Sequence, residues 1–252
     1  MDKLRAFSYA QRGNILFLIL LAIILLVALS LAITSQRDGG KSVSDEKAQS
    51  LAAQTLQYLT LVENTVNRMI LTGVAVENLD FRDPNGTSQV QTGTNTGCAS
   101  PSCQVFNKNG GGLNAMALSP QAADTTRNAS NFNAEGGARG DVLLVSIKGV
   151  GTTLSDIAFF YRAVDPNVCR QINIVMGINT ATDALPVDGL GVNNSGGGAS
   201  DFSAYEGAMN PIPVLTADVL GDYDPRLIGK RTLCVYRSAS NGYYLYHVLV
   251  AR

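Results

Sequence analysis

Residues 14–33 read NILFLILLAIILLVALSLAI, and this stretch decides the fold. From Ile15 to Ile33 it holds no charged residue and a single hydroxyl side chain, Ser30. Nineteen residues at about 1.5 Å each make a helix of roughly 28 Å, which matches the hydrocarbon core of a bilayer. We therefore expect a transmembrane helix over residues 14–34, in contact with membrane lipid.

Two other interpretations of this run are a buried core helix and a cleaved secretory signal. A core helix of this length usually carries a polar stripe, which the run lacks. Ser30 and Ala32 are small enough to end a secretory signal, but the apolar region of a signal is usually about 7 to 15 residues long. A cut after Ala32 would release a secreted protein instead of an anchored one.

The composition of the 252-residue chain excludes several functions. Lys and Arg number 19 against 20 Asp and Glu, so the net charge of −1 gives no electrostatic case for a nucleic-acid partner. One histidine excludes a multi-histidine metal site and leaves a single candidate for a histidine base. We expect no catalytic residues, no metal and no cofactor.

The cysteines indicate which side of the membrane holds the bulk of the chain. Basic residues lie on both sides of the apolar run, so the positive-inside rule favours a cytoplasmic N-terminus only slightly. All four cysteines follow the run, and an even number on one side suits an oxidising compartment. They are Cys98, Cys103, Cys169 and Cys234.

The junction before the apolar run resembles the N-terminus of type IV prepilins and pseudopilins. A short basic leader ends in Gln11-Arg12-Gly13, and the apolar run begins at once with Asn14. The resemblance implies that prepilin peptidase removes residues 1–13 by cutting between Gly13 and Asn14, and that the new N-terminus is methylated. A glycine suits such a site because a protease binds its substrate extended.

The resemblance also implies a location and partners. It implies a single-pass protein of the bacterial inner membrane, with a cytoplasmic N-terminus, a periplasmic or surface-exposed C-terminal domain, and other pilin-like subunits as partners. Asn14 stands where the family prefers Phe or Met, and Leu18 stands where the family usually has Glu. Members without this Glu are typically minor components at or near a tip. The resemblance therefore implies a minor, non-enzymatic structural or assembly protein of a type IV pilus or type II secretion-like filament.

The chain after the membrane run predicts an α+β fold. Gly39 and Gly40 form a joint, and apolar residues at three- or four-residue spacing predict an amphipathic helix over 42–72 that ends at Gly73. This helix packs on a sheet, presents a surface to neighbouring subunits, or does both. Residues 73–252 are expected to form a β-rich globular domain, giving a pilin-like arrangement of one long helix on an antiparallel sheet.

Strands and loops alternate in this domain. Residues 83–140 and 188–200 are rich in Gly, Asn, Ser and Thr, and predict long loops with one short strand or helix near Leu113 to Leu118. The Asn241-Gly242 turn predicts a hairpin between the last two strands. Strands are predicted over 142–147, 157–164, 172–178, 233–236 and 243–250.

Four cysteines allow three disulfide pairings. We favour Cys98 with Cys103, because the pair is local, and Cys169 with Cys234, because it joins two strand-like regions. On the chain-entropy estimate the first bond is worth about 2 kcal/mol and the second about 4 kcal/mol. A four-thiolate zinc site is the alternative, although the spacing lacks paired C-x2-C knuckles.

The remaining candidate residues give weak signals. His247 lies in a predicted strand, where alternation places its side chain on the other face from those of Tyr246 and Val248. Gly149-Val150-Gly151 lacks the third glycine of a dinucleotide loop. No G-x-S-x-G elbow is present. Another class of protein therefore stays open: a single-span envelope protein with an extracytoplasmic binding or enzymatic domain. Two sets of oxygen-bearing side chains could face calcium without matching its loop pattern, namely Asp218, Asp222 and Asp224, and Asp80, Asp83 and Asn85.

Overall fold

The computed structural model describes residues 19–26, 43–84, 90–91, 95–125, 139–188, 203–204, 219–237 and 242–252. The chain divides into two compact units, Met1–Glu46 and Lys47–Arg252. In the first unit, residues 19–26 are helical. No helix within the described ranges combines the length and the apolar character needed to cross a bilayer. Most of the predicted span 14–34, and the predicted processing residues Gly13 and Asn14, lie outside the described residues.

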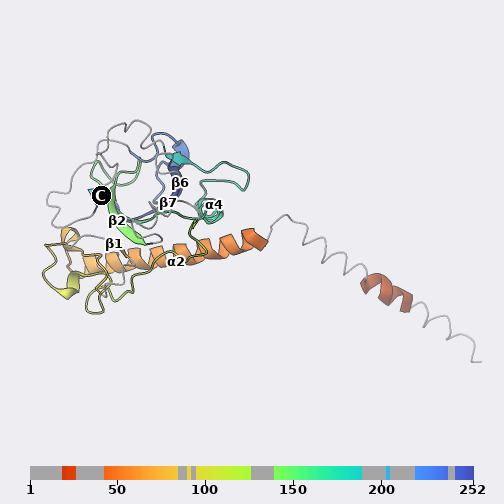
Figure 1. Cartoon of the computed structure of the whole chain (residues 1–252), viewed down its shortest axis with the longest axis horizontal. Coiled ribbons are helices and arrows are strands. Elements are labelled where there is room, and N and C mark those ends of the chain that lie inside the picture. The colour runs from red at the N-terminus through yellow and green to blue at the C-terminus, as the bar shows by residue number, and fades with distance from the viewer. Residues whose placement is uncertain are drawn as a thin grey trace, which may run out of the picture. The chain divides into compact units, whose positions relative to one another are not determined.

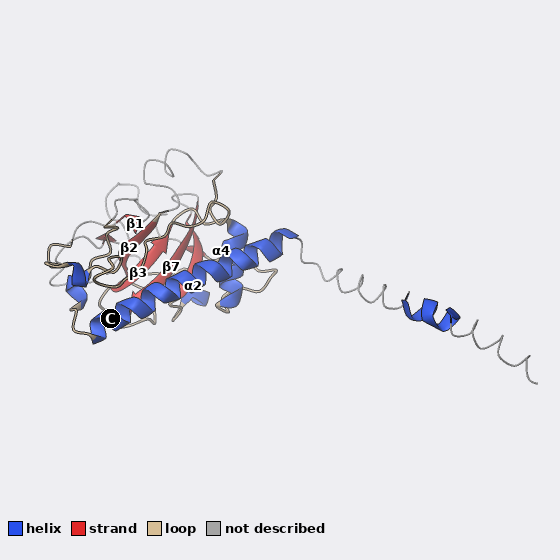
Figure 2. Cartoon of the chain, turned by 90° about the horizontal axis from the view of Figure 1, so that it is seen from below, coloured by secondary structure: helices blue, strands red, loops and turns tan. Residues whose placement is uncertain are grey.

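The predicted amphipathic helix is α2, Val43–Leu71. Asp45 and Glu46 lie in its first turn and Arg68 in its last, which suits the helix dipole. The helix ends at Leu71, and the turn that follows contains Gly73, whose φ of +101° favours glycine. Figure 2 shows α2 lying across one face of the sheet. The residues that it buries recur every three or four positions, as an amphipathic helix requires; they include Ala52, Leu59, Val62, Val66 and Met69.

Four strands form the antiparallel centre of the sheet and confirm the α+β prediction (Figure 1). In spatial order they are β2 (Gly140–Val145), β3 (Asp156–Tyr161), β7 (Gly242–Val250) and β6 (Thr232–Arg237). The pairing of β6 with β7 runs from Thr232 opposite His247 to Arg237 opposite Gly242, as the predicted hairpin requires.

Three two-residue strands extend the sheet at its edges. β1 (Val90–Gln91) runs parallel to β2, and β4 (Val187–Asp188) runs parallel to β6. β5 (Ser203–Ala204) pairs antiparallel with β2. The sheet is therefore antiparallel at its centre, and its short described edge strands are parallel in β1 and β4 and antiparallel in β5.

The predicted strand over residues 172–178 is wrong, because most of this segment belongs to a helix. α4 spans Pro166–Val175. The Asp165 side chain accepts hydrogen bonds from the N–H groups of Asn167, at 2.8 Å, and Val168, at 3.2 Å. An Asp followed by Pro is a strong helix-start signal, and here it outweighs the β-branched residues that follow.

Both faces of the sheet are covered, so β3 is buried at every position. On one face, Phe159, Tyr161 and Leu245 pack in one cluster with α2 and α4. On the other face, Phe160, Tyr246 and Val248 pack with Ile178, Leu220 and Leu227. This burial explains why residues 157–161 of β3 form a continuous apolar run and do not alternate with polar residues.

The predicted short strand or helix near Leu113 to Leu118 is also wrong, because residues 112–119 have no regular secondary structure. Two tyrosines hold this segment instead. The Tyr58 hydroxyl donates to Asn114 O at 3.2 Å and accepts from Met116 N at 3.0 Å. The Tyr161 hydroxyl donates to Met116 O at 2.9 Å. These side-chain bonds replace the backbone ladder of a regular element.

Candidate functional site

The exposed side of α2 carries no charge between Gln49 and Asn67. We call the exposed residues of the stretch 49–67 the outer face of α2. Charged residues make up roughly a quarter to a third of a typical soluble surface, so nine exposed positions would ordinarily include two or three. The outer face is Gln49, Ser50, Ala53, Gln54, Gln57, Thr60, Leu61, Asn64 and Asn67.

The one charged residue in this stretch, Glu63, points to the sheet. Its Oε1 lies 2.8 Å from Arg231 Nη2, and its Oε2 lies 3.1 Å from His247 Nε2. Arg231 also donates to Val248 O at 3.2 Å. These contacts take the charge of Glu63 away from the outer face and attach α2 to β6 and β7.

His247 is the candidate base of the sequence, and it lies in this cluster. Its Nδ1 and the Thr232 hydroxyl share a hydrogen bond of 2.7 Å. Burial lowers the pKa of His247, although the Glu63 carboxylate acts to raise it. Hydroxyl, imidazole and carboxylate follow the order of a nucleophile, its base and an orienting acid. Thr232 and His247 are only 8% and 6% exposed, however, so the arrangement serves as a buried cross-link between α2 and the sheet.

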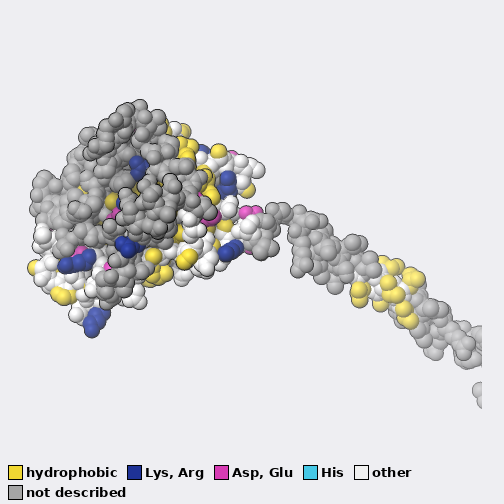
Figure 3. Space-filling view, in the orientation of Figure 1, with side chains coloured by type: hydrophobic (Ala, Val, Ile, Leu, Met, Phe, Trp, Pro, Cys, Tyr) yellow, Lys and Arg dark blue, Asp and Glu magenta, His cyan; other side chains and the backbone are white. Residues whose placement is uncertain are grey.

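The apolar segment, residues 19–26, exposes all its large side chains. Each of its Ile and Leu residues is at least 45% exposed. Figure 3 shows this segment as a yellow band without blue or magenta side chains. Exposed apolar side chains on every side of a helix are unfavourable in water and favourable in lipid.

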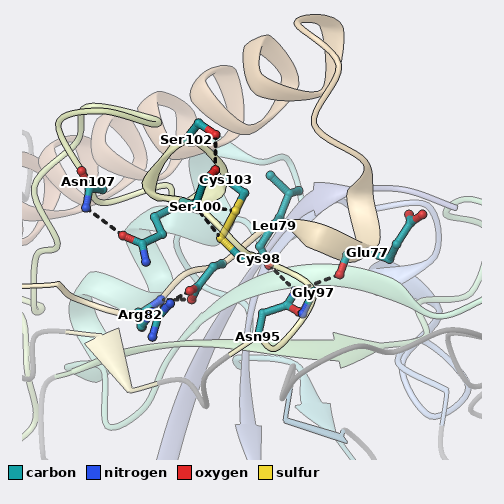
Figure 4. The surroundings of a disulfide bond; sticks show 12 residues. Glu77, Leu79, Arg82, Asn95, Gly97, Cys98, Ser100, Ser102, Cys103 and Asn107 are labelled. Carbon is teal, nitrogen blue, oxygen red and sulfur yellow. Dashed lines mark hydrogen bonds and ion pairs between the residues drawn. A yellow bond between two sulfur atoms is a disulfide. The ribbon is translucent and has the colours of Figure 1, made fainter.

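The Cys98–Cys103 disulfide lies in an ordered loop (Figure 4). Asn95 fixes one side of this loop by donating to Glu77 O at 2.8 Å and to Leu79 O at 2.7 Å. Its own side-chain oxygen accepts from Gly97 N–H at 2.8 Å. A buried Asn with these three bonds positions the segment before the disulfide.

The same loop is attached to the end of α2. Arg68 donates from Nη2 to Gly111 O at 2.7 Å. A Cβ at Gly111 would lie 2.2 Å from Val105 O, so the glycine permits this close approach. The Gly110-Gly111-Gly112 run, which the sequence assigns to a loop, is thus part of a tightly packed turn.

The second disulfide joins Cys169 of α4 to Cys234 of β6. Both favoured pairings are therefore present, although the second joins a helix to a strand and not two strands. All four thiols are used in these bonds, so they form no four-thiolate zinc site. Asp165 followed by Pro166 is the sequence signal that could have predicted the helix that carries Cys169.

Three of the four described members of the calcium sets lie beside protein cations. Asp80 lies 2.6 Å from Arg82 Nε, Asp222 lies 2.9 Å from Lys148 Nζ, and Asp224 lies 2.6 Å from Arg226 Nη2. Asn85 and Asp218 lie outside the described residues. Where the structure is described, no group of three His, Cys, Asp or Glu side chains could hold a metal ion.

The other weak candidates are structural in the described chain. Gly149 and Gly151 have φ angles of +78° and +60°, in the turn between β2 and β3, where no helix follows.

A small cavity of about 80 Å³ lies between α2 and the 116–119 segment, lined partly by Leu51, Thr55 and Met116. Neither Thr232 nor His247 lines it, so the cavity and the histidine cluster are separate features.

Comparison of the chain with family models, with curated proteins and with solved structures found no match.

Proposed function

We propose that the chain is a membrane-anchored, pilin-like structural or assembly subunit without enzymatic activity. In this proposal, residues 14–34 hold it in the bacterial inner membrane, and the β-rich domain lies in the periplasm or at the cell surface. The subunit is a minor component of a type IV pilus or type II secretion-like filament. The prepilin-like junction at Gly13 and Asn14, and Leu18 in place of the usual Glu, support this assignment.

The observation that carries the proposal is the uncharged outer face of α2 in a chain that also has an exposed apolar segment. The outer face covers residues 49–67, a length of roughly 28 Å along the helix. Interfaces between subunits are depleted of charge at their centre because a buried charge must be paired. The outer face therefore suits contact with helices of other pilin-like subunits.

The buried position of His247 supports a non-enzymatic function. The Thr232 hydroxyl and the His247 imidazole are buried between α2 and the sheet. Their contacts with each other and with Glu63 attach α2 to the sheet. A nucleophile must be reachable by its substrate, and Thr232 at 8% exposure is poorly placed for that.

Mass spectrometry of the mature protein tests the processing step. In a strain with active prepilin peptidase, the N-terminal residue is expected to be a methylated Asn14. The matched control is the Gly13→Ile variant, whose branched side chain blocks the close approach that glycine allows, and which is expected to retain Met1. A wild-type chain that keeps Met1, or that begins at Ile33 after a cut behind Ala32, contradicts the proposal.

Crosslinking in cells tests the outer face of α2. A photoreactive residue at Thr60 or Asn64 is expected to give crosslinks to other pilin-like subunits, because both positions are on the outer face. The matched control is Val62, which is completely buried in the same turn of the helix and is expected to give crosslinks only within the chain. Equal intermolecular crosslinking from all three positions, or none from Thr60 and Asn64, contradicts this function.

A further inference from the structure

One carboxylate decides whether the outer face of α2 is neutral. Glu63 follows Thr60 by three residues and precedes Asn67 by four, so both of these outer-face residues are its neighbours on the helix surface. Its side chain is 19% exposed and is directed to the sheet by its contacts with Arg231 and His247. Without these contacts the carboxylate would turn to water, beside Thr60 and Asn67, because burial of an unpaired charge is unfavourable.

The two partners of Glu63 are themselves held in position. Arg231 donates from Nη2 to Val248 O at 3.2 Å, and its own carbonyl accepts from Val248 N–H at 2.8 Å. His247 is 6% exposed, and its Nδ1 shares the 2.7 Å hydrogen bond with the Thr232 hydroxyl. Glu63 thus contacts a fixed guanidinium and a fixed imidazole, so the direction of its side chain depends on residues of the sheet.

We propose that Arg231 and His247 determine which partner the outer face of α2 accepts, because they keep the Glu63 carboxylate away from it. With Glu63 held inward, the outer face fits an uncharged helix surface of another subunit. With Glu63 turned outward, the same face favours a partner surface that carries Lys or Arg, since a carboxylate that loses its water at an interface must be paired. This inference rests on the proposed function, because it concerns the partner of the same surface.

A Thr60→Cys chain reports the position of the carboxylate without any partner. The native cysteines are in disulfides, so alkylation of the full chain in a mild detergent at low ionic strength follows the new thiol alone. Combining Arg231→Gln with His247→Gln is expected to move the midpoint of the pH dependence of alkylation up by about 0.5, because a nearby carboxylate raises the pKa of a thiol. Adding Glu63→Gln is expected to remove this difference. Ala53→Cys, roughly 15 Å along the helix from Glu63, is the matched control and is expected to show no change.

Crosslinking in cells tests the choice of partner. A photoreactive residue at Gln57 lies on the outer face, roughly 9 Å along the helix from Glu63. Its crosslinks to other pilin-like subunits are expected to fall at least fivefold in the chain that combines Arg231→Gln with His247→Gln. Adding Glu63→Gln is expected to restore them to within twofold. The restored chain still lacks both contacts between α2 and the sheet, so lost attachment cannot account for this pattern.

The two measurements separate failure of this inference from failure of the proposed function. An unchanged alkylation midpoint at residue 60 overturns the inference alone, and so does a loss of crosslinks that Glu63→Gln does not restore. A wild-type chain without intermolecular crosslinks from Gln57 overturns the proposed function, and the inference with it. If the double variant does not fold, Arg231→Gln alone provides both tests, with Arg231→Lys as the control that keeps a cation beside Glu63.

Discussion

Replacing Cys169 and Cys234 together by serine is expected to lower the free energy of unfolding by about 4 kcal/mol, because the disulfide closes a long loop in the unfolded chain. The two cysteines are 65 residues apart, so the unfolded chain gains much conformational freedom when the bond is absent. Chemical denaturation of the full chain, followed by far-ultraviolet circular dichroism, measures the change; tyrosine fluorescence is a second probe, since the chain has no Trp.

The other disulfide provides a control of the same chemistry. Cys98 and Cys103 are five residues apart, so their replacement by serine is expected to cost only about 2 kcal/mol. All four cysteines are buried, with Cys98 and Cys103 8% exposed and Cys169 and Cys234 completely covered, so each double variant places two hydroxyls at buried positions. Equal losses would show that local packing, and not the length of the closed loop, sets the contribution of each bond.

The sequence predicts the elements whose signal is local. The 42–72 helix, the 142–147 and 157–164 strands and the final hairpin all correspond to observed elements, because their periodicity and turn residues act over short distances. The sequence predicts a strand over residues 172–178 because Ile172, Ile174 and Val175 are β-branched, whereas Ile172–Val175 form the last turn of α4, which begins after Asp165. That start was also a local signal, and it could have given the correct helix.

Contacts between distant segments could not be predicted from the sequence. The sequence predicts His247 in a strand, but its partners Glu63 and Thr232 come from α2 and β6, and no spacing in the sequence relates them. Likewise, the segment after Leu113 depends on the hydroxyls of Tyr58 and Tyr161, which lie 45 to 58 residues from the atoms they bind. The uncharged side of α2 depends likewise on the inward direction of Glu63, which its contacts with Arg231 and His247 determine.

Replacing the buried carboxylate of Asp156 is also expected to have a large effect, but it raises the free energy of unfolding and does not lower it. Asp156 begins β3, is 1% exposed, and accepts a hydrogen bond at Oδ1 from Arg252 N–H at 2.9 Å. Burial raises the pKa of Asp156 to about 6, although this hydrogen bond and the charges of Arg231 and Arg252 act to lower it. At neutral pH the folded chain therefore holds Asp156 as a buried, ionised carboxylate, although the neutral acid would be less unfavourable at this position.

Asp156→Asn is expected to raise the free energy of unfolding at pH 7.5 by about 2 to 3 kcal/mol, because two pKa units correspond to about that much. The Asn oxygen can still accept the Arg252 N–H. Between pH 4 and pH 6 Asp156 is more protonated in the folded than in the unfolded wild-type chain, so the contribution of Asp156 to stability falls as the pH rises through this window. The advantage of the variant should therefore be near zero at pH 3.5 and complete above pH 6.5. Denaturation at both pH values measures it.

His247 acts in the opposite direction, which is why the difference between variant and wild type is the quantity to measure. Its pKa is lowered by burial, so its stabilising contribution is present above its unfolded pKa, about 6.5, and is lost as the pH falls through its folded value. This contribution is common to wild type and Asp156→Asn, and it cancels in their difference. Asp222→Asn is the control, since Asp222 is half exposed beside Lys148 and should change stability by less than about 0.5 kcal/mol at either pH. If Asp156→Asn gives the same difference at pH 3.5 and pH 7.5, the buried charge is not what limits stability, and the change acts through packing or hydrogen bonding alone.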